Sequence, residues 1–171
     1  MSIPLKPREA DKQELDYILD LVSRKFESER AFYTLCSLTQ STWIRFKTGG
    51  ILTLTRYSWE CIVDALFTRY EYMLFQKAKA QVVRNPKMSL EKTYEELKLK
   101  HARHIVRQGG TIGVDSVPSK NGLRVRNYVN VQDQLGNHIS FRVNCQASDI
   151  PTELDYRIDW FDTQLERLLM Y

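Results

Sequence analysis

Residues 31–66 read AFYTLCSLTQSTWIRFKTGGILTLTRYSWECIVDAL, and this stretch decides how the front of the chain is organised. Its apolar residues recur three and four positions apart, which predicts two short helices within 29–47, with a break at Ser37 to Gln40. Thr39 is a favourable N-cap for the helix that begins at Gln40. The pair Gly49–Gly50 is expected to end that helix, because glycine readily takes the positive φ of a C-cap.

The same helical spacing extends on both sides of this stretch. An apolar stripe predicts a helix over 8–26, and a helix capped by Thr53 or Thr55 is expected to run towards Val83. Asn85–Pro86 is a clear breaker, and Ser89 is a good N-cap for a further helix that ends at Gly109–Gly110.

Beyond Gly110 the apolar period changes from helical to two. Apolar and polar residues alternate over 125–131 and 139–143, on either side of the turn at 134–137, which predicts an antiparallel hairpin. A short earlier strand is expected at 111–114 and a closing helix over 152–171. We therefore predict an α+β fold. A helical module over 1–85 precedes a module over 86–171, built of a helix, a small antiparallel hairpin and a closing helix.

Charge is unevenly distributed along the 171 residues. Residues 1–146 hold 23 bases and 15 acids, whereas the last 25 residues hold six acids and two bases. A basic body with an acidic end fits a polyanionic partner, and it also fits an ordinary solvated surface whose acidic end pairs with a basic neighbour. The three cysteines form no paired framework, and no signal-peptide core or long apolar run is present, so we expect a reduced, cytoplasmic protein without a membrane span.

The run from Leu38 to Gly49 resembles the second half of a Cro/C1-type (XRE-like) helix-turn-helix, in which a polar Ser/Thr–Gln–Ser/Thr run opens a short recognition helix. Ile62–Leu66 is similar to the I-x-x-A-L stretch that often follows it in that family. The resemblance implies sequence-specific binding of double-stranded DNA by a transcriptional regulator of phage, plasmid or defence type. Such proteins commonly bind as homodimers.

The residues themselves support such a contact. Gln40 is suited to bond adenine at two atoms, and Ser41 and Thr42 adapt to several bases. Arg45 lies one turn further on, and Lys47 with Arg56 is placed to hold phosphates. The expected DNA-binding set is Thr39, Gln40, Ser41, Thr42, Arg45, Lys47 and Arg56. Trp43 and Phe46 are expected to face inward with Leu35 and Leu38.

Three residues depart from the family pattern. Tyr33 stands where a small residue is usual, Ser37 where glycine is common, and the large Trp43 where an aliphatic residue is usual. A helical core with a glycine-terminated turn also explains the stretch. The alternative function is therefore a protein-interaction or adaptor module whose helix-turn-helix is a scaffold only.

A second basic feature predicts a different nucleic-acid surface. Cations on the helix around 98–107 and on the hairpin are spaced to follow a phosphate backbone, which would suit RNA or a single strand; they are Lys98, Lys100, Arg103, Arg107, Arg124 and Arg126. The competing interpretation is a solvated helix face.

Catalytic and metal motifs are not apparent in the sequence. It contains no GxSxG, Walker-type loop, HExxH or GxGxxG, and Gly109–Gly113 leads into a strand pattern. His101 and His104 are three residues apart, with no third ligand at a suitable spacing. We therefore expect no enzymatic activity, no cofactor and no metal.

Overall fold

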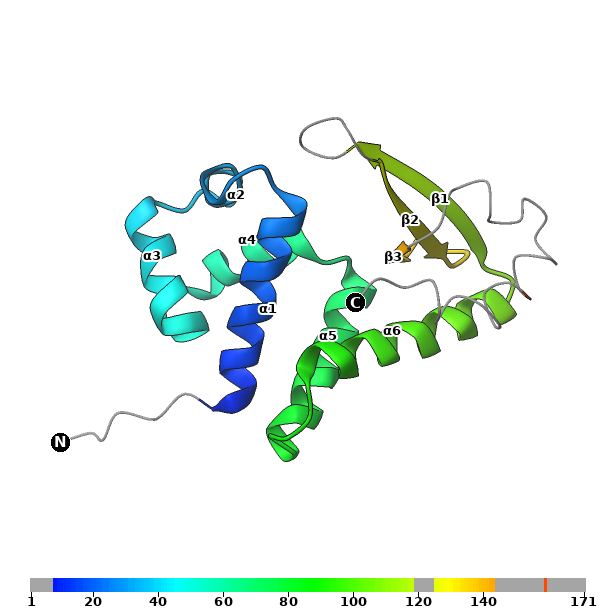
Figure 1. Cartoon of the computed structure of the whole chain (residues 1–171), viewed down its shortest axis with the longest axis horizontal. Coiled ribbons are helices and arrows are strands. Elements are labelled where there is room, and N and C mark those ends of the chain that lie inside the picture. Colours follow the sequence, from blue (N-terminus) through cyan, green and yellow to red (C-terminus); the bar gives the residue numbers. More distant parts are fainter. Residues whose placement is uncertain (1–7, 119–124, 144–158, 160–171) are drawn as a thin grey trace. The chain divides into compact units, whose positions relative to one another are not determined.

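The computed structural model describes residues 8–118, 125–143 and 159, and its contacts divide the chain into two compact units, Met1–Leu97 and Lys98–Tyr171 (Figure 1). The predicted α+β class is confirmed: over the described residues, six α-helices precede a three-stranded antiparallel sheet. The sequence predicted a division at 85/86. The contacts place it inside helix α6 (Leu90–Arg107), because Leu90 and Tyr94 belong to the core of the first unit.

The first unit is helical, and most of its elements match the sequence prediction. They are α1 (Glu9–Lys25), α2 (Glu29–Leu35), α3 (Gln40–Gly49), the 3-10 helix η1 (Gly50–Thr53), α4 (Arg56–Leu66) and α5 (Arg69–Arg84). Thr39 caps α3 and Thr55 caps α4, as expected for residues whose side-chain oxygen accepts an N–H of the first turn. Helix α3 ends at the predicted glycine pair, and Gly50 has a φ of 75°.

The expectation of one helix running from α4 to Val83 was wrong. The chain breaks at Phe67–Thr68, where Thr68 and Glu71 form a capping box. The Glu71 N–H donates to Thr68 Oγ1 at 3.2 Å, and the Thr68 N–H donates to Glu71 Oε1 at 2.9 Å. This reciprocal pair satisfies two backbone donors that a helix start leaves unpaired.

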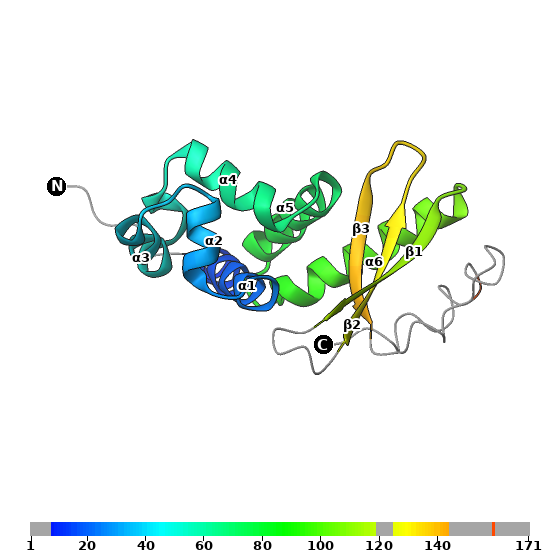
Figure 2. The same cartoon turned by 90° about the horizontal axis from the view of Figure 1, so that it is seen from above.

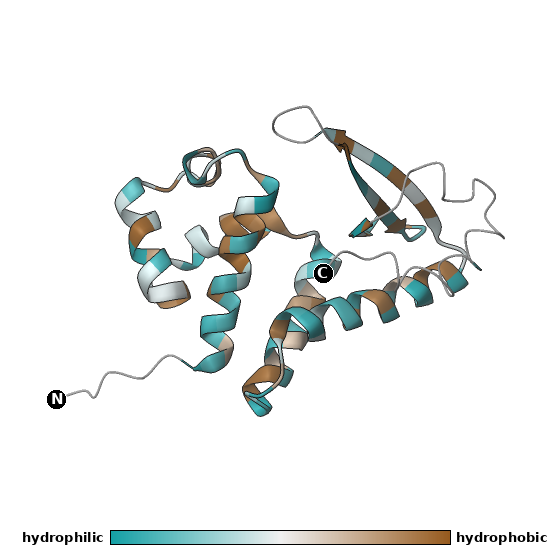
Figure 3. Ribbon diagram, in the orientation of Figure 1, coloured by the Kyte–Doolittle hydropathy of each residue, from teal (hydrophilic) through white to brown (hydrophobic). Residues whose placement is uncertain are grey.

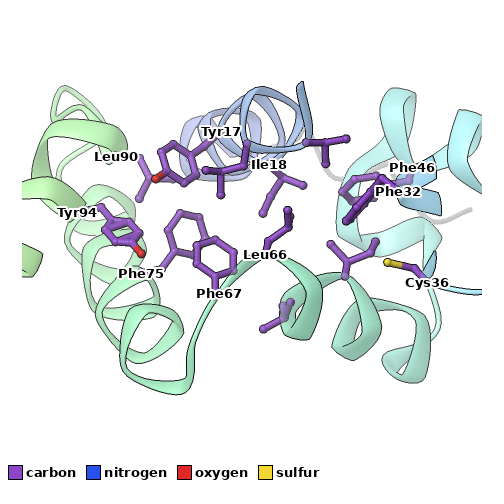
Figure 4. Packing of buried hydrophobic residues seen from close by; sticks show 14 of the residues in the cluster. Tyr17, Ile18, Phe32, Cys36, Phe46, Leu66, Phe67, Phe75, Leu90 and Tyr94 are labelled. Carbon is purple, nitrogen blue, oxygen red and sulfur yellow. The ribbon is translucent and has the colours of Figure 1, made fainter. Parts of the chain in front are cut away.

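Helix α1 lies at the centre of the first unit and contacts α2, α4 and α5. Its Tyr17 and Ile18 are buried, and the Tyr17 ring packs against Phe75 and Tyr94, as Figure 4 shows. The ring centroids of Tyr17 and Phe75 are 5.4 Å apart, and those of Phe67 and Phe75 are 4.9 Å apart. Aromatic pairs at such distances contribute beyond the area that they bury.

The second unit contains the predicted hairpin and a longer first strand than expected. Strands β1 (Thr111–Pro118), β2 (Val125–Gln132) and β3 (His138–Val143) pair antiparallel in the order β1-β2-β3 (Figure 2). Alternate residues of β2 and β3 are buried on one face, and apolar and polar colours alternate along the strands in Figure 3. The predicted closing helix over 152–171 lies outside the described residues, apart from Asp159.

The glycine pair after α6 is required for the turn into the sheet. Gly109 has a φ of 91°, and the Gly110 N–H donates to the Ile105 carbonyl at 2.9 Å. A Cβ on Gly110 would lie 2.7 Å from the Gln132 carbonyl oxygen and 2.5 Å from Ile105 Cγ2. A side chain at this position would therefore force the helix end and strand β2 apart.

Loss of the capping box should destabilise the helical unit. Thr68→Ala is expected to lower the free energy of unfolding by about 1 kcal/mol, because it removes the acceptor at the start of α5. Urea denaturation followed by circular dichroism measures this. Thr34→Ala changes an exposed threonine within α2 and should alter stability by less than about 0.5 kcal/mol. Equal losses in the two variants would contradict the role of the cap.

Candidate nucleic-acid interface

Helices α2 and α3 are joined by a tight turn at Cys36–Thr39. Ser37 has a φ of 58° and is the one non-glycine residue with positive φ in the described part of the chain. The Ser37 N–H donates to the Thr34 carbonyl at 3.0 Å, and the Leu38 N–H donates to the Tyr33 carbonyl at 2.8 Å. The turn thus needs a left-handed residue at the position where glycine is common in the family that the sequence resembles.

Two aromatic residues anchor α3 to the helical core. Trp43 and Phe46 are each 1% exposed, as predicted. The Trp43 ring lies edge-on to Phe32 with 5.4 Å between centroids, and its centroid is 5.5 Å from that of Phe46. Tyr33 packs beside Trp43 at 6.3 Å. The bulky residues that depart from the family pattern therefore contact one another.

The sequence placed Leu35 on this inward side with Leu38, and that was wrong for Leu35. Leu38 is buried, but the Leu35 side chain is 63% exposed. Helix α2 ends at Leu35, and Cys36 is the residue that turns inward, with its Sγ donating to the Cys61 carbonyl at 3.7 Å. Burial raises the pKa of the Cys36 thiol to about 11, so Cys36 behaves as a small core residue.

The outward face of α3 is formed by residues that recur with helical period. Gln40, Ser41 and Arg45 are exposed, as their proposed role requires, and Ile44 and Thr48 lie on the same stripe and are exposed as well. Sequence reasoning missed Ile44 and Thr48, although their spacing from Gln40 was visible. Helix α3 lies at the edge of the helical unit away from α5 in both Figure 1 and Figure 2.

Hydroxyl groups organise the start of α3. Thr39 Oγ1 accepts the Thr42 N–H at 3.2 Å and lies 3.1 Å from Ser41 Oγ and 2.9 Å from Thr42 Oγ1. Arg45 Nη2 donates to Thr42 Oγ1 at 3.4 Å. Thr39 therefore caps the helix and Thr42 accepts a hydrogen bond from Arg45, while Gln40 is exposed in the first turn.

The two predicted phosphate ligands each pair with a carboxylate. Lys47 Nζ lies 3.0 Å from Glu29 Oε2, and Arg56 Nε lies 3.2 Å from Glu60 Oε1. The hydrogen bond from Lys47 holds the pKa of Glu29 below its usual range. Both pairs are largely exposed, and exposed pairs are weak, so an incoming phosphate can displace either carboxylate.

The second basic feature contains one residue that the sequence misjudged. Lys98 is 7% exposed, and its ammonium group lies 4.9 Å from the centroid of the Phe141 ring. It stands one turn beyond Tyr94, so it continues the buried stripe of α6 and does not face a ligand. Lys100 and Arg107 are exposed and Arg103 and Arg126 are half-buried, whereas Arg124 lies outside the described residues.

Comparison with known proteins adds no relative. No protein-family model matches the chain, and no curated protein matches it either. Within the described residues, no group of three or more metal-ligating side chains comes together, and no helix is long and apolar enough to cross a membrane.

Removal of the Lys47 ammonium should release Glu29. In Lys47→Met the pKa of Glu29 is expected to rise towards that of an ordinary glutamate, because the hydrogen bond that lowers it is lost. Carboxyl-detected NMR titration measures this pKa. Lys77→Met, at an exposed position of α5, should leave it unchanged. An unchanged Glu29 pKa in Lys47→Met would contradict the pairing in solution.

Proposed function

We propose that α2 and α3 form a helix-turn-helix that binds double-stranded DNA in a sequence-specific manner, and that the protein is a transcriptional regulator. One observation carries the proposal: Trp43 and Phe46 fix α3 from the inside, while Gln40, Ser41 and Arg45 are exposed on its outside. A polar helix face held rigidly at the edge of a domain is what entry into a groove requires.

The dimensions and chemistry of α3 suit the major groove. Ten residues make a helix about 15 Å long, and the groove, about 12 Å wide, admits one helix. Gln40 in the first turn is suited to adenine, and Arg45 is suited to guanine, while Ser41 adapts to several bases. The positive end of the helix dipole also lies at Gln40, which favours nearby phosphates.

Electrostatics supports binding but does not dominate it. Lys47 and Arg56 can each contact a phosphate only after releasing the carboxylate with which they pair. Glu29 also places a negative charge beside Lys47. The basic excess over residues 1–146 attracts DNA at longer range. Affinity should therefore depend on base contacts as well as on salt.

Binding as a homodimer is part of the proposal. A single short recognition helix covers only a few base pairs, and two copies one helical turn apart, about 34 Å, would read two half-sites. The predicted closing helix over 152–171 fits either closure of the hairpin's open face within one chain or pairing of two copies, and it lies outside the described residues apart from Asp159.

Two other functions are separated from this one by experiment. The single-strand or RNA surface loses one cation, because Lys98 is buried against Phe141. The adaptor function needs no nucleic acid at all. If the RNA or single-strand surface is correct, substitutions on the outer face of α3 leave nucleic-acid binding unchanged. If the adaptor function is correct, the protein binds no duplex that these substitutions could weaken.

Substitutions on α3 should weaken binding to a duplex selected from a random pool. Gln40→Ala and Arg45→Ala are each expected to cost about 1–3 kcal/mol, since each removes a base contact, and Gln40→Ala should also relax the sequence preference. Gel-shift titration of the selected duplex measures both. Gln76→Ala, at an exposed glutamine of α5, is the matched control and should bind normally.

The same experiment identifies the alternatives. Normal binding by the α3 variants together with poor binding by Arg103→Ala and Arg107→Ala would favour the RNA or single-strand surface. Failure of the unmodified protein to retain any nucleic acid at about 0.1 M salt would favour the adaptor function.

Glu29 should oppose DNA binding. Glu29→Gln is expected to strengthen duplex binding, because it removes a negative charge and frees Lys47 for a phosphate. The dependence of log K on log salt concentration should steepen by about one for one additional phosphate contact. Glu96→Gln, at an exposed position of α6, is the control of equal charge change. An equal gain in both variants would assign the effect to net charge alone.

A further inference from the structure

Ile44 is an apolar residue in the middle of a polar helix face. It is 52% exposed, and its neighbours one turn away on the same stripe are Gln40 and Thr48, with Arg45 beside it. It is the one large apolar side chain of α3 that is exposed, because Trp43 and Phe46 are buried.

The helix gains little from an isoleucine at this position. A β-branched side chain loses rotamer freedom in a helix, and one that is 52% exposed recovers only part of the energy of burial. Alanine, lysine or glutamine would suit an exposed position in the centre of α3 better. Ile44 therefore suits a surface that α3 meets on binding rather than the stability of α3 itself.

The major groove offers one apolar group, the 5-methyl group of thymine. We infer that Ile44 contacts a thymine methyl group, so that the DNA target contains a T·A pair close to the base pair read by Gln40. The inference rests on the DNA binding proposed above and specifies its target.

The spacing along α3 places the two contacts on neighbouring base pairs. Gln40 and Ile44 are four residues apart, about 6 Å along the helix axis, and base pairs are stacked about 3.4 Å apart. The thymine should therefore lie within about two base pairs of the adenine that Gln40 contacts. Cytosine lacks the methyl group and presents an N4 donor, for which Ile44 has no acceptor.

Uracil is the sharpest probe, because it differs from thymine only by the methyl group. Each thymine of the selected duplex is replaced in turn by deoxyuridine, and Kd is measured for the unmodified protein, for Ile44→Ala and for Leu52→Ala. Leu52 is 87% exposed in η1, outside α3, and serves as the matched apolar control. Circular dichroism checks that each variant keeps its helices.

Replacement of one particular thymine by deoxyuridine should raise Kd more than replacement of any other thymine. This replacement should weaken binding of the unmodified protein and of Leu52→Ala by about fourfold, the contribution of one buried methyl group. Ile44→Ala should bind the thymine duplex more weakly than the unmodified protein and should show no loss with uracil at that position.

Two results would overturn the inference while the proposed function stands. In the first, a duplex is bound specifically but no thymine is sensitive to uracil. In the second, Ile44→Ala keeps the same sensitivity as the unmodified protein. If no duplex is selected at all, the proposed function fails and the inference fails with it.

Discussion

Burial of the Trp43 indole is the interaction on which the outer face of α3 depends. With Phe46, it fixes the rotation of α3 about its own axis, and this rotation turns Gln40, Ile44 and Arg45 outward. A buried tryptophan removes roughly 150–250 Å² from water, which is worth roughly 4–6 kcal/mol before the cost of ordering the side chain and the cost of about 1–3 kcal/mol for the buried Trp43 indole N–H, which has no hydrogen-bond partner among the described residues. That gain far exceeds what a capping hydroxyl contributes. The aromatic anchor therefore sets the orientation, and Thr39 only sets where the helix begins.

The departures from the family pattern are coupled to one another. A small residue at position 33 would allow α2 and α3 to approach closely, but Tyr33 and Trp43 are both large and instead pack side by side. Ser37 takes the left-handed conformation in the turn at some conformational cost that glycine would avoid. The buried aromatic contacts of Trp43 more than offset this cost, so the turn persists without glycine.

Periodicity predicted much of the fold and rather less of the side-chain environment. Helical spacing located α1, α3 and α6, and alternation located the hairpin. The break between α4 and α5 was missed because the apolar stripe continues across it, although Thr68 and Glu71 carried the capping signal. Lys98 was predicted to belong to the nucleic-acid surface because of its charge. It is buried against Phe141 because it lies on the apolar stripe of α6 and has a long apolar stem. Leu35 was assigned inward by spacing, which fails where a helix ends.

At the candidate interface, too, the sequence pattern located the helix but did not predict which side chains pair with one another. The number of cations in the sequence predicts strong electrostatic attraction to DNA phosphates. In the structure, however, Lys47 pairs with Glu29 and Arg56 pairs with Glu60. On α3 itself, Arg45 is then the remaining cation that no carboxylate neutralises within the described contacts. Few phosphate contacts mean weak non-specific binding, since counterion release scales with the number of phosphates neutralised. A regulator with this surface would gain its affinity from base contacts along α3 and from a second copy of the chain on the adjacent half-site.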